Sequence, residues 1–303
     1  MNKKLSAAGV TAAAVTPARR VSSYLYKHPG ARLRGLIAMP AIWLGAVYVA
    51  ALVMLLVTAF WTVDEFTGNT KVALNFGNVI SLFTDPLYTA VTLRTIGIAL
   101  GVTIVDIALA LPIAFFMSKV AGPKLRNIIA ISVLLPLWAS YLVKAYAWRS
   151  VLSDKGVLQW LLAPLGLDTP GYSLWGAAIT LGYIWLPYVI LPIYGGLEKV
   201  PGNLLEASSD LGAKTFTTLR RVVFPIILPS IIAGSIFAFS LTLGDYITIN
   251  IVGGPNQMLG NLIYSNVGTA NNLPMAAALA LIPIAIMFGY LASVKRTGAL
   301  DNL

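Results

Sequence analysis

Six long stretches of this chain are almost free of charged residues, and they constrain the fold more than any other feature of the sequence. Hydrophobic residues make up 58% of the chain and charged residues only 11%, whereas soluble domains carry about 25% charged residues. A membrane-spanning helix needs about 20 mainly apolar residues. The six stretches are 36–61, 96–117, 128–146, 174–195, 226–243 and 275–294. We therefore expect an all-α, polytopic membrane protein with six transmembrane helices in one domain, residues 36–294.

Lysine and arginine gather in alternate connections between these stretches. One side has the basic tail 1–35, Lys119, Lys124, Arg126, Lys199, Lys214, Arg220, Arg221, Lys295 and Arg296; the other has only Lys71, Arg94, Arg149 and Lys155, with Lys144 near a helix end. Connections rich in lysine and arginine stay in the cytoplasm. The sequence therefore predicts a cytoplasmic N-terminal tail, a cytoplasmic loop 198–225 and a cytoplasmic C-terminal tail 295–303. This distribution accounts for the net charge of +10, so we expect no nucleic-acid partner.

The loop 198–225 has a helical pattern of its own. Asn203 is placed to cap a helix, with Glu206 three residues later reaching back to the cap. Leu204, Ala207, Ser208 and Leu211 fall on one helix face. Gly212 is predicted to end this helix in the left-handed conformation, and a second helical run leads to Pro225. The pattern is a helix, a glycine hinge and a second helix inside one polar loop.

No residue pattern supports catalysis by this chain. The run Gly212-Ala213-Lys214-Thr215 lacks the glycine before the lysine that a phosphate-binding loop needs. HExxH and GxSxG signatures are missing as well. Cysteine is absent, and the one histidine, His28, lies in the basic tail. We expect no catalytic residue, no metal site and no cofactor bound by this chain; any energy source is supplied by another chain.

Two carboxylates lie inside or beside the apolar stretches. Asp106 is midway along the second stretch, and Asp245 directly follows the fifth. A charge inside a bilayer is costly and usually functional. Asp106 could pair with a hydroxyl or with a cation such as Lys144 or Arg94, or it could line a transport pathway. Asp245 is an equally open candidate for the pathway.

Aromatic residues concentrate near the outer ends of the stretches. They fit an interfacial belt, or some of them could hold an organic cation by cation–π contact. Trp185 lies deeper, where the belt explains it less well. The candidate pathway residues are Asp245, Tyr246, Asp106, Trp138, Tyr141 and Trp185.

Gly97 and Gly101 form a GxxxG spacing at the start of the second stretch. Small residues at this spacing let helices approach closely. In a membrane protein with 26 glycines, chance explains the spacing as well, and the sequence alone does not decide between the two.

The loop 198–225 resembles the EAA motif of ABC-importer permeases. That pattern is Glu-Ala-Ala, three residues, Gly, nine residues, then Ile-x-Leu-Pro. Here it is Glu206-Ala207-Ser208, Gly212 and Val222-Val223-Phe224-Pro225, with Ser208, Val222 and Phe224 as conservative departures. The resemblance covers the chain from the first stretch to the C-terminus. It implies the type I ABC importer permease fold and a location in the inner membrane of a prokaryote. It also implies that the ATPase subunit docks on Glu206, Ala207, Ser208, Asp210, Gly212 and Pro225.

A narrower resemblance is to the spermidine/putrescine permease subfamily. It rests on Leu243-Gly244-Asp245-Tyr246-Ile247-Thr248, Val252-Gly253-Gly254-Pro255 and Pro136-Leu137-Trp138. Ile249 stands where that subfamily leads us to expect proline. The resemblance implies polyamine import by a complex of this subunit, a homologous second permease, two ATPase subunits that bind ATP and magnesium, and an extracytoplasmic binding protein.

Other functions stay open at this point. The same importer machinery could carry ferric iron, an amino-acid derivative or an anion. A self-sufficient secondary carrier or channel would not need the helix–glycine–helix loop. A membrane enzyme or anchor has no motif in its favour.

Overall fold

The computed structural model describes residues 26–27, 29–64 and 67–295. Helices dominate it, and its one sheet is a short antiparallel pair in which β1 (Thr62–Val63) lies against β2 (Thr70–Lys71). The expected all-α class is thus confirmed. Most of the basic tail 1–35, and all of the C-terminal tail after Lys295, lie outside the described residues.

The chain divides into two units, at Leu55 and Leu56, and each is described by itself. The first unit contains most of α2 (Pro29–Thr58). Its stretch Gly35–Thr58 is long and apolar enough to cross a membrane, and apolar residues fall on every face of the helix. This helix therefore presents apolar side chains on all sides, as a lipid-facing or partner-facing span does.

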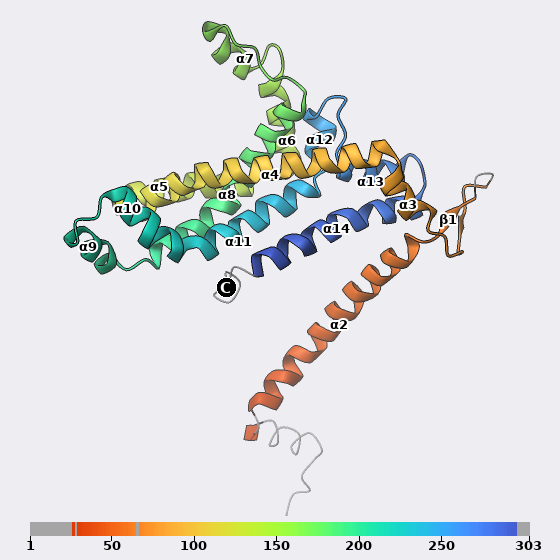
Figure 1. The fold of residues 1–303 in the computed structure, drawn as a ribbon, viewed down its shortest axis with the longest axis horizontal. Coiled ribbons are helices and arrows are strands. Elements are labelled where there is room, and N and C mark those ends of the chain that lie inside the picture. Colours follow the sequence, from red (N-terminus) through yellow and green to blue (C-terminus); the bar gives the residue numbers. More distant parts are fainter. Residues whose placement is uncertain (1–25, 28, 65–66, 296–303) are drawn as a thin grey trace, which may run out of the picture. The chain divides into compact units, whose positions relative to one another are not determined.

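The second unit is built around three long helices that pack pairwise: α4 (Pro86–Phe115), α8 (Leu174–Glu198) and α11 (Phe224–Leu243). Figure 1 shows them side by side with α14 (Leu273–Lys295). Leu181, Ile190 and Ile193 of α8 are fully buried in the core that these helices form.

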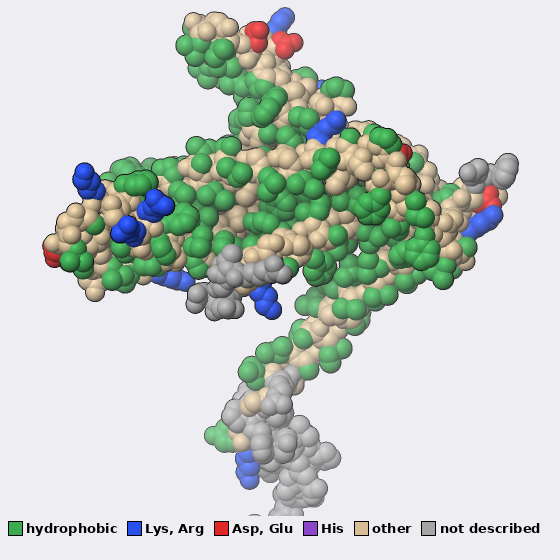
Figure 2. Space-filling view, in the orientation of Figure 1, with side chains coloured by type: hydrophobic (Ala, Val, Ile, Leu, Met, Phe, Trp, Pro, Cys, Tyr) green, Lys and Arg blue, Asp and Glu red, His purple; other side chains and the backbone are tan. Residues whose placement is uncertain are grey.

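Figure 2 shows hydrophobic side chains along the flanks of this unit, whereas lysine and arginine gather at the end that carries α9 and α10. That distribution suits a bundle immersed in lipid.

Shorter elements connect these helices. They are α3 (Gly77–Thr84), the π-helix η1 (Phe116–Val120), α5 (Pro123–Trp138), α6 (Tyr141–Leu152), α7 (Val157–Leu162), the 3-10 turn η2 (Ala163–Leu165), α9 (Gly202–Asp210), α10 (Thr215–Thr218), the π-helix η3 (Leu219–Val223), α12 (Ile247–Val252) and α13 (Leu259–Gly268). In Figure 1, α6 and α7 project away from the long helices of this unit.

Two of the expected stretches differ from the helices observed. The second helix begins ten residues before Ile96, at Pro86, because the Asp85 side chain accepts a hydrogen bond from the Leu87 amide (2.8 Å) and Pro86 fits the first turn. The stretch 128–146, expected as one helix, is broken. Its two parts, α5 and α6, meet at 101° because Ala139 and Ser140 are both extended. The described residues contain five helices that are long and apolar enough to cross a membrane, or six if this bent pair is counted as one span.

The close contact between α8 and α11 yields a prediction with a built-in control. A Cβ added at Gly196 would lie 2.3 Å from Oγ and 2.7 Å from Cβ of Ser230 on α11, whereas one added at Gly195 would meet nothing within 4 Å. Gly196→Ala should therefore lower the stability in detergent by about 1–3 kcal/mol, as overpacking does. Gly195→Ala should leave it unchanged or raise it, since alanine favours helix more than glycine does. Thermal unfolding of the two variants checks this, and equal behaviour would contradict the packing described.

Candidate functional site

Two spans of the bundle are interrupted, and the interruptions are joined to each other. The first lies between α5 and α6 at Ala139 and Ser140. The second lies between α11 and α12, where the helix ends at Leu243 and resumes at Ile247. An interrupted helix at membrane depth frees backbone groups that need other partners. Transporters use such discontinuous helices to bind substrates and ions.

Tyr141, Asp245 and Thr248 form the hydrogen-bonded cluster that joins the two interruptions. The Tyr141 hydroxyl donates to Oδ2 of Asp245 and also lies 2.5 Å from Oγ1 of Thr248. Oδ1 of Asp245 accepts the Thr248 amide hydrogen at 2.9 Å. Asp245 is only 7% exposed. The carboxylate thus caps α12 and holds the first residue of α6, as acidic groups at helix N-termini do.

Aromatic rings continue from this cluster toward the surface. Tyr141 stacks on Trp185 of α8, with ring centroids 5.6 Å apart. Trp185 meets Tyr188 edge-on at 5.8 Å, and Tyr188 lies 6.4 Å from Phe237 of α11. Trp185 is buried, whereas Tyr188 and Phe237 are exposed. A row of rings that ends at a buried carboxylate has the chemistry to attract an organic cation.

The structure brings only some of the predicted pathway residues together. Asp245, Tyr141 and Trp185 meet in one cluster. Tyr246 instead stacks on Tyr264 of α13 at 4.7 Å, and Trp138 is 90% exposed at the end of α5. Neither belongs to the cluster, because residues adjacent to a helix break point in different directions.

Asp106 lies apart from this cluster and lines a cavity between α4 and α8. It is fully buried, and neither carboxylate oxygen has a hydrogen-bond partner within the described part of the chain. The expected pairing with Lys144 or Arg94 is therefore not formed. Arg94 instead donates to the Gln257 carbonyl oxygen at 3.4 Å.

Sequence reasoning missed Thr248 and Phe237. Thr248 follows Asp245 by three residues, which is the spacing of a side chain that accepts from a backbone amide, so it had a local signal. Phe237 had no local signal in the sequence, because its contact with Tyr188 depends on which face of α11 turns toward α8.

The loop 198–225 folds as a helix, a glycine turn and a second helix. α9 ends in a Schellman motif, with Gly212 N–H bonded to the Ser209 carbonyl (2.8 Å) and Ala213 N–H bonded to the Ser208 carbonyl (3.1 Å). Gly212 has φ +77°, so the predicted left-handed conformation is confirmed. The predicted cap by Asn203 and Glu206 is wrong. α9 starts earlier, at Gly202, after Pro201, and has no side-chain cap.

The two helical parts of the loop are held together and tied to the bundle. The Ser208 and Thr218 hydroxyls lie 2.8 Å apart. Lys119, in the π-helix η1, donates to the Val200 carbonyl at 2.9 Å. A second π-helix, η3, leads from α10 into α11, and Pro225 is the second residue of α11. Short π-helical segments within α-helices are frequent at functional sites.

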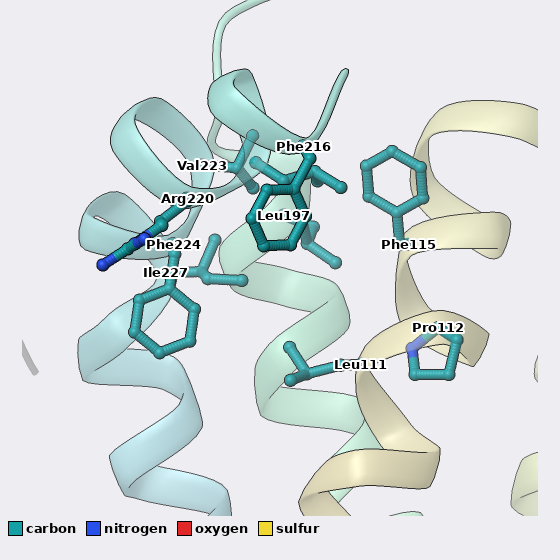
Figure 3. Close-up of a pocket in the computed structure, with 10 residues that line it drawn as sticks. Leu111, Pro112, Phe115, Leu197, Phe216, Arg220, Val223, Phe224 and Ile227 are labelled. Carbon is teal, nitrogen blue, oxygen red and sulfur yellow. The ribbon is translucent and has the colours of Figure 1, made fainter. Parts of the chain in front are cut away.

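Apolar side chains on this loop remain uncovered. Leu211 is 88% exposed, and Leu204 is also exposed. Glu206, Ala207 and Asp210 of the motif are exposed as well. Phe216 faces a cavity of about 690 Å³, and Figure 3 shows it over Leu197, with Phe115 of α4 nearby. The loop, which also exposes Lys214, Arg220 and Arg221, therefore offers apolar, acidic and basic side chains without a partner in the described chain.

Comparison with known proteins identifies the family. The family described as "binding-protein-dependent transport system inner membrane component" matches residues 100–296. The chain belongs to this family. Inner membrane ABC transporter permease protein YdcU of Escherichia coli is 43% identical over 94% of this chain and 95% of that protein. Spermidine/putrescine transport system permease protein PotB of E. coli is 32% identical over 77% of this chain and 86% of that protein.

Solved structures agree on the fold. A bacterial ABC transporter involved in import of the acidic polysaccharide alginate matches with a TM-score of 0.67 at 17% identity, over 91% of this chain and 99% of that chain. The methionine ABC transporter MetNI matches with a TM-score of 0.55 at 15% identity, over 69% of this chain and 93% of that chain. The expected type I ABC importer permease fold is confirmed.

These findings establish the general role of the chain. It is a multi-pass permease subunit of a bacterial ABC importer and is not an enzyme, because ATP hydrolysis in this family belongs to a separate subunit. The alternatives of a self-sufficient carrier and of a membrane enzyme are therefore excluded.

The Tyr141 cluster generates a prediction about coupling. A hydrogen bond to a charged group contributes about 1.5–3 kcal/mol. Tyr141→Phe and Asp245→Asn should each destabilise the protein in detergent, and the double variant should lose less than the sum, since both remove one shared interaction. Tyr146→Phe, an exposed tyrosine one turn along α6, serves as the control and should change little. Additive effects in the thermal unfolding of the three variants would show that the cluster does not couple the two breaks.

Proposed function

We propose that this chain is the permease subunit of an ATP-driven importer of polyamines, delivered by an extracytoplasmic binding protein. The observation that carries the proposal is the buried carboxylate of Asp245 at the end of a row of aromatic rings. A polyamine is a flexible polycation, so it needs carboxylates and aromatic faces along its route. The names of the PotB relatives, which are spermidine/putrescine permeases, support the same cargo.

The Tyr141 cluster suggests how cargo and helix breaks are linked. An arriving ammonium group would compete with the Tyr141 hydroxyl for the Asp245 carboxylate, because a carboxylate binds a cationic donor more strongly than a neutral one. Displacement of Tyr141 would remove one of the two side-chain bonds between α6 and α12, whereas Arg149 of α6 would still donate to the Ile251 carbonyl oxygen of α12 at 2.7 Å. In this mechanism the cargo itself loosens one of the contacts between the two interrupted spans.

The loop 198–225 is the proposed docking site of the ATPase subunit. Its motif residues are Glu206, Ala207, Ser208, Asp210, Gly212 and Pro225. Ser208 faces Thr218 and holds the loop together, whereas Glu206, Ala207 and Asp210 are exposed for contact. ATP and magnesium would bind to the ATPase pair, and closure of that pair would move the loop and, with it, α8 and α11.

The proposed assembly contains this chain, a second homologous permease, two ATPase subunits and the binding protein. E. coli PotB and PotC are both named as permeases of the spermidine/putrescine system, which supports two different permease chains in one importer. The excess of lysine and arginine in the tail 1–35 and in the loop 198–225 supports a cytoplasmic location for the loop and both termini.

The docking role of the loop predicts that an acidic side chain at Leu211 separates the subunits. Leu211→Asp should keep the permease folded, because Leu211 is almost fully exposed, yet it should lower recovery of the ATPase subunit with the tagged permease at least about tenfold. Leu165→Asp, at another exposed leucine in η2, is the matched control and should leave recovery unchanged. Equal recovery of the ATPase with both variants would contradict docking at this loop.

The cargo proposal is tested by uptake of radiolabelled spermidine or putrescine. Cells that lack other polyamine importers should take up the label only when this chain is present. Asp245→Asn should lower uptake at least about tenfold, since loss of a buried charge partner costs about 2 kcal/mol or more. Asp154→Asn, an exposed acid after α6, is the control. Equal uptake with and without this chain would refute polyamines and favour ferric iron, an amino-acid derivative or an anion as cargo.

A further inference from the structure

A groove between α4 and α8 in the second unit lies apart from the cluster of Tyr141, Asp245 and Thr248. Its cavity has a volume of about 750 Å³. Small residues line it from both helices, with Gly97 and Gly101 on α4 and Gly182 on α8. Trp175 and Tyr183 add exposed aromatic rings on the α8 side. The groove is therefore wide, mainly apolar and open to the outside of the unit.

Asp106 and Arg94 are the two charged residues that line this groove, and Arg94 donates to the Gln257 carbonyl oxygen at 3.4 Å. Asp106 has 0% exposure, and both carboxylate oxygens lack a hydrogen-bond partner among the described residues. A Cβ at Gly182 would lie 3.2 Å from Oδ1, so only the missing side chain of Gly182 leaves room beside the carboxylate. A buried carboxylate without a partner costs several kcal/mol. Such a group inside a membrane bundle usually faces a partner or a pathway.

The outer edge of the groove is suited to a close helix contact. Gly97, Gly101, Val105 and Leu109 follow one another at intervals of four residues and are all exposed. A Cβ at Gly97 or at Gly101 would meet nothing within 4 Å. Rows of small residues at this spacing let two membrane helices approach closely and pack without a hydrophobic driving force. The chance explanation for the GxxxG spacing does not account for the unpaired carboxylate beside it.

We propose that a membrane-spanning helix of the second permease subunit lies in this groove and supplies the hydrogen-bond donor for Asp106. The occupant is a polypeptide helix, because the row from Gly97 to Leu109 is apolar and long enough to match a helix, and the unpaired carboxylate of Asp106 lies beside it. It is a different permease chain, because two relatives from one organism are both named as permeases of a single transport system. The inference rests on the proposed importer assembly and does not depend on the cargo.

Glycine substitutions test the groove directly. A Cβ at position 101 meets nothing within 4 Å, so Gly101→Leu should narrow the groove while the permease still folds and inserts. Recovery of the second permease with the tagged chain should fall at least tenfold, or about 1.4 kcal/mol. Gly289→Leu is the matched control, since Gly289 lies in α14 and a Cβ there also meets nothing within 4 Å. If both variants recover the second permease equally, the proposal is wrong.

Substitution of Asp106 tests whether the second permease supplies the hydrogen-bond donor for this carboxylate. Asp106→Leu should make the separately purified permease at least as stable in thermal unfolding, because it removes an unpaired buried carboxylate. The same substitution should weaken recovery of the second permease at least tenfold. Loss of stability without loss of recovery would show that Asp106 serves this chain alone and would overturn the proposal.

Site-specific photo-crosslinking identifies the occupant. The importer is purified in full with a photoreactive residue at Val105 in the groove or, as the control, at the exposed Phe288 of α14. Val105 should crosslink to the second permease and Phe288 should not. Crosslinks from Val105 to another copy of this chain, or to lipid alone, would overturn the proposal. If no second permease is recovered with the unmodified chain, the proposed assembly fails as well, and this outcome is distinct from failure of the groove.

Discussion

The Tyr141 hydroxyl lies between the carboxylate of Asp245 and the hydroxyl of Thr248, and this contact joins two spans that are each interrupted. A second side-chain bond, from Arg149 of α6 to the Ile251 carbonyl oxygen of α12 at 2.7 Å, supports the same junction. Because Asp245 is buried, its hydrogen bonds replace solvation that the carboxylate loses. The carboxylate therefore helps to hold α12 against α6 and, in the proposed importer, is an acceptor for a cation that reaches it.

Long helices connect this cluster to the loop 198–225. α11 runs without interruption from Phe224 to Leu243, a length of about 30 Å. α8 packs closely along it at Gly196 and again at Gly234, where a Cβ would lie 3.1 Å from Cα of Val189. A displacement of the loop would thus be carried to Asp245 by rigid helices. In the proposed importer, ATPase closure and cargo release are linked through this path.

The sequence was sufficient for the spans and the loop motif, because hydropathy and the position of Gly212 are local properties. It was not sufficient for the break in 128–146, since Ala139 and Ser140 interrupt an apolar run without any charge or glycine. The cluster required a contact across 104 residues, from Tyr141 to Asp245. For that reason Tyr246 and Trp138, which are near the breaks in sequence, were predicted for the pathway but lie outside the cluster.

The central claim is that ATP hydrolysis by another subunit drives a polyamine past Asp245 of this chain. The most direct measurement is spermidine accumulation in proteoliposomes that contain the complete importer, with the binding protein and with ATP on the ATPase side. We expect accumulation that requires ATP and every subunit and that falls at least about tenfold in the Asp245→Asn importer. Accumulation by the permease alone, or accumulation unaffected by Asp245→Asn, would contradict it.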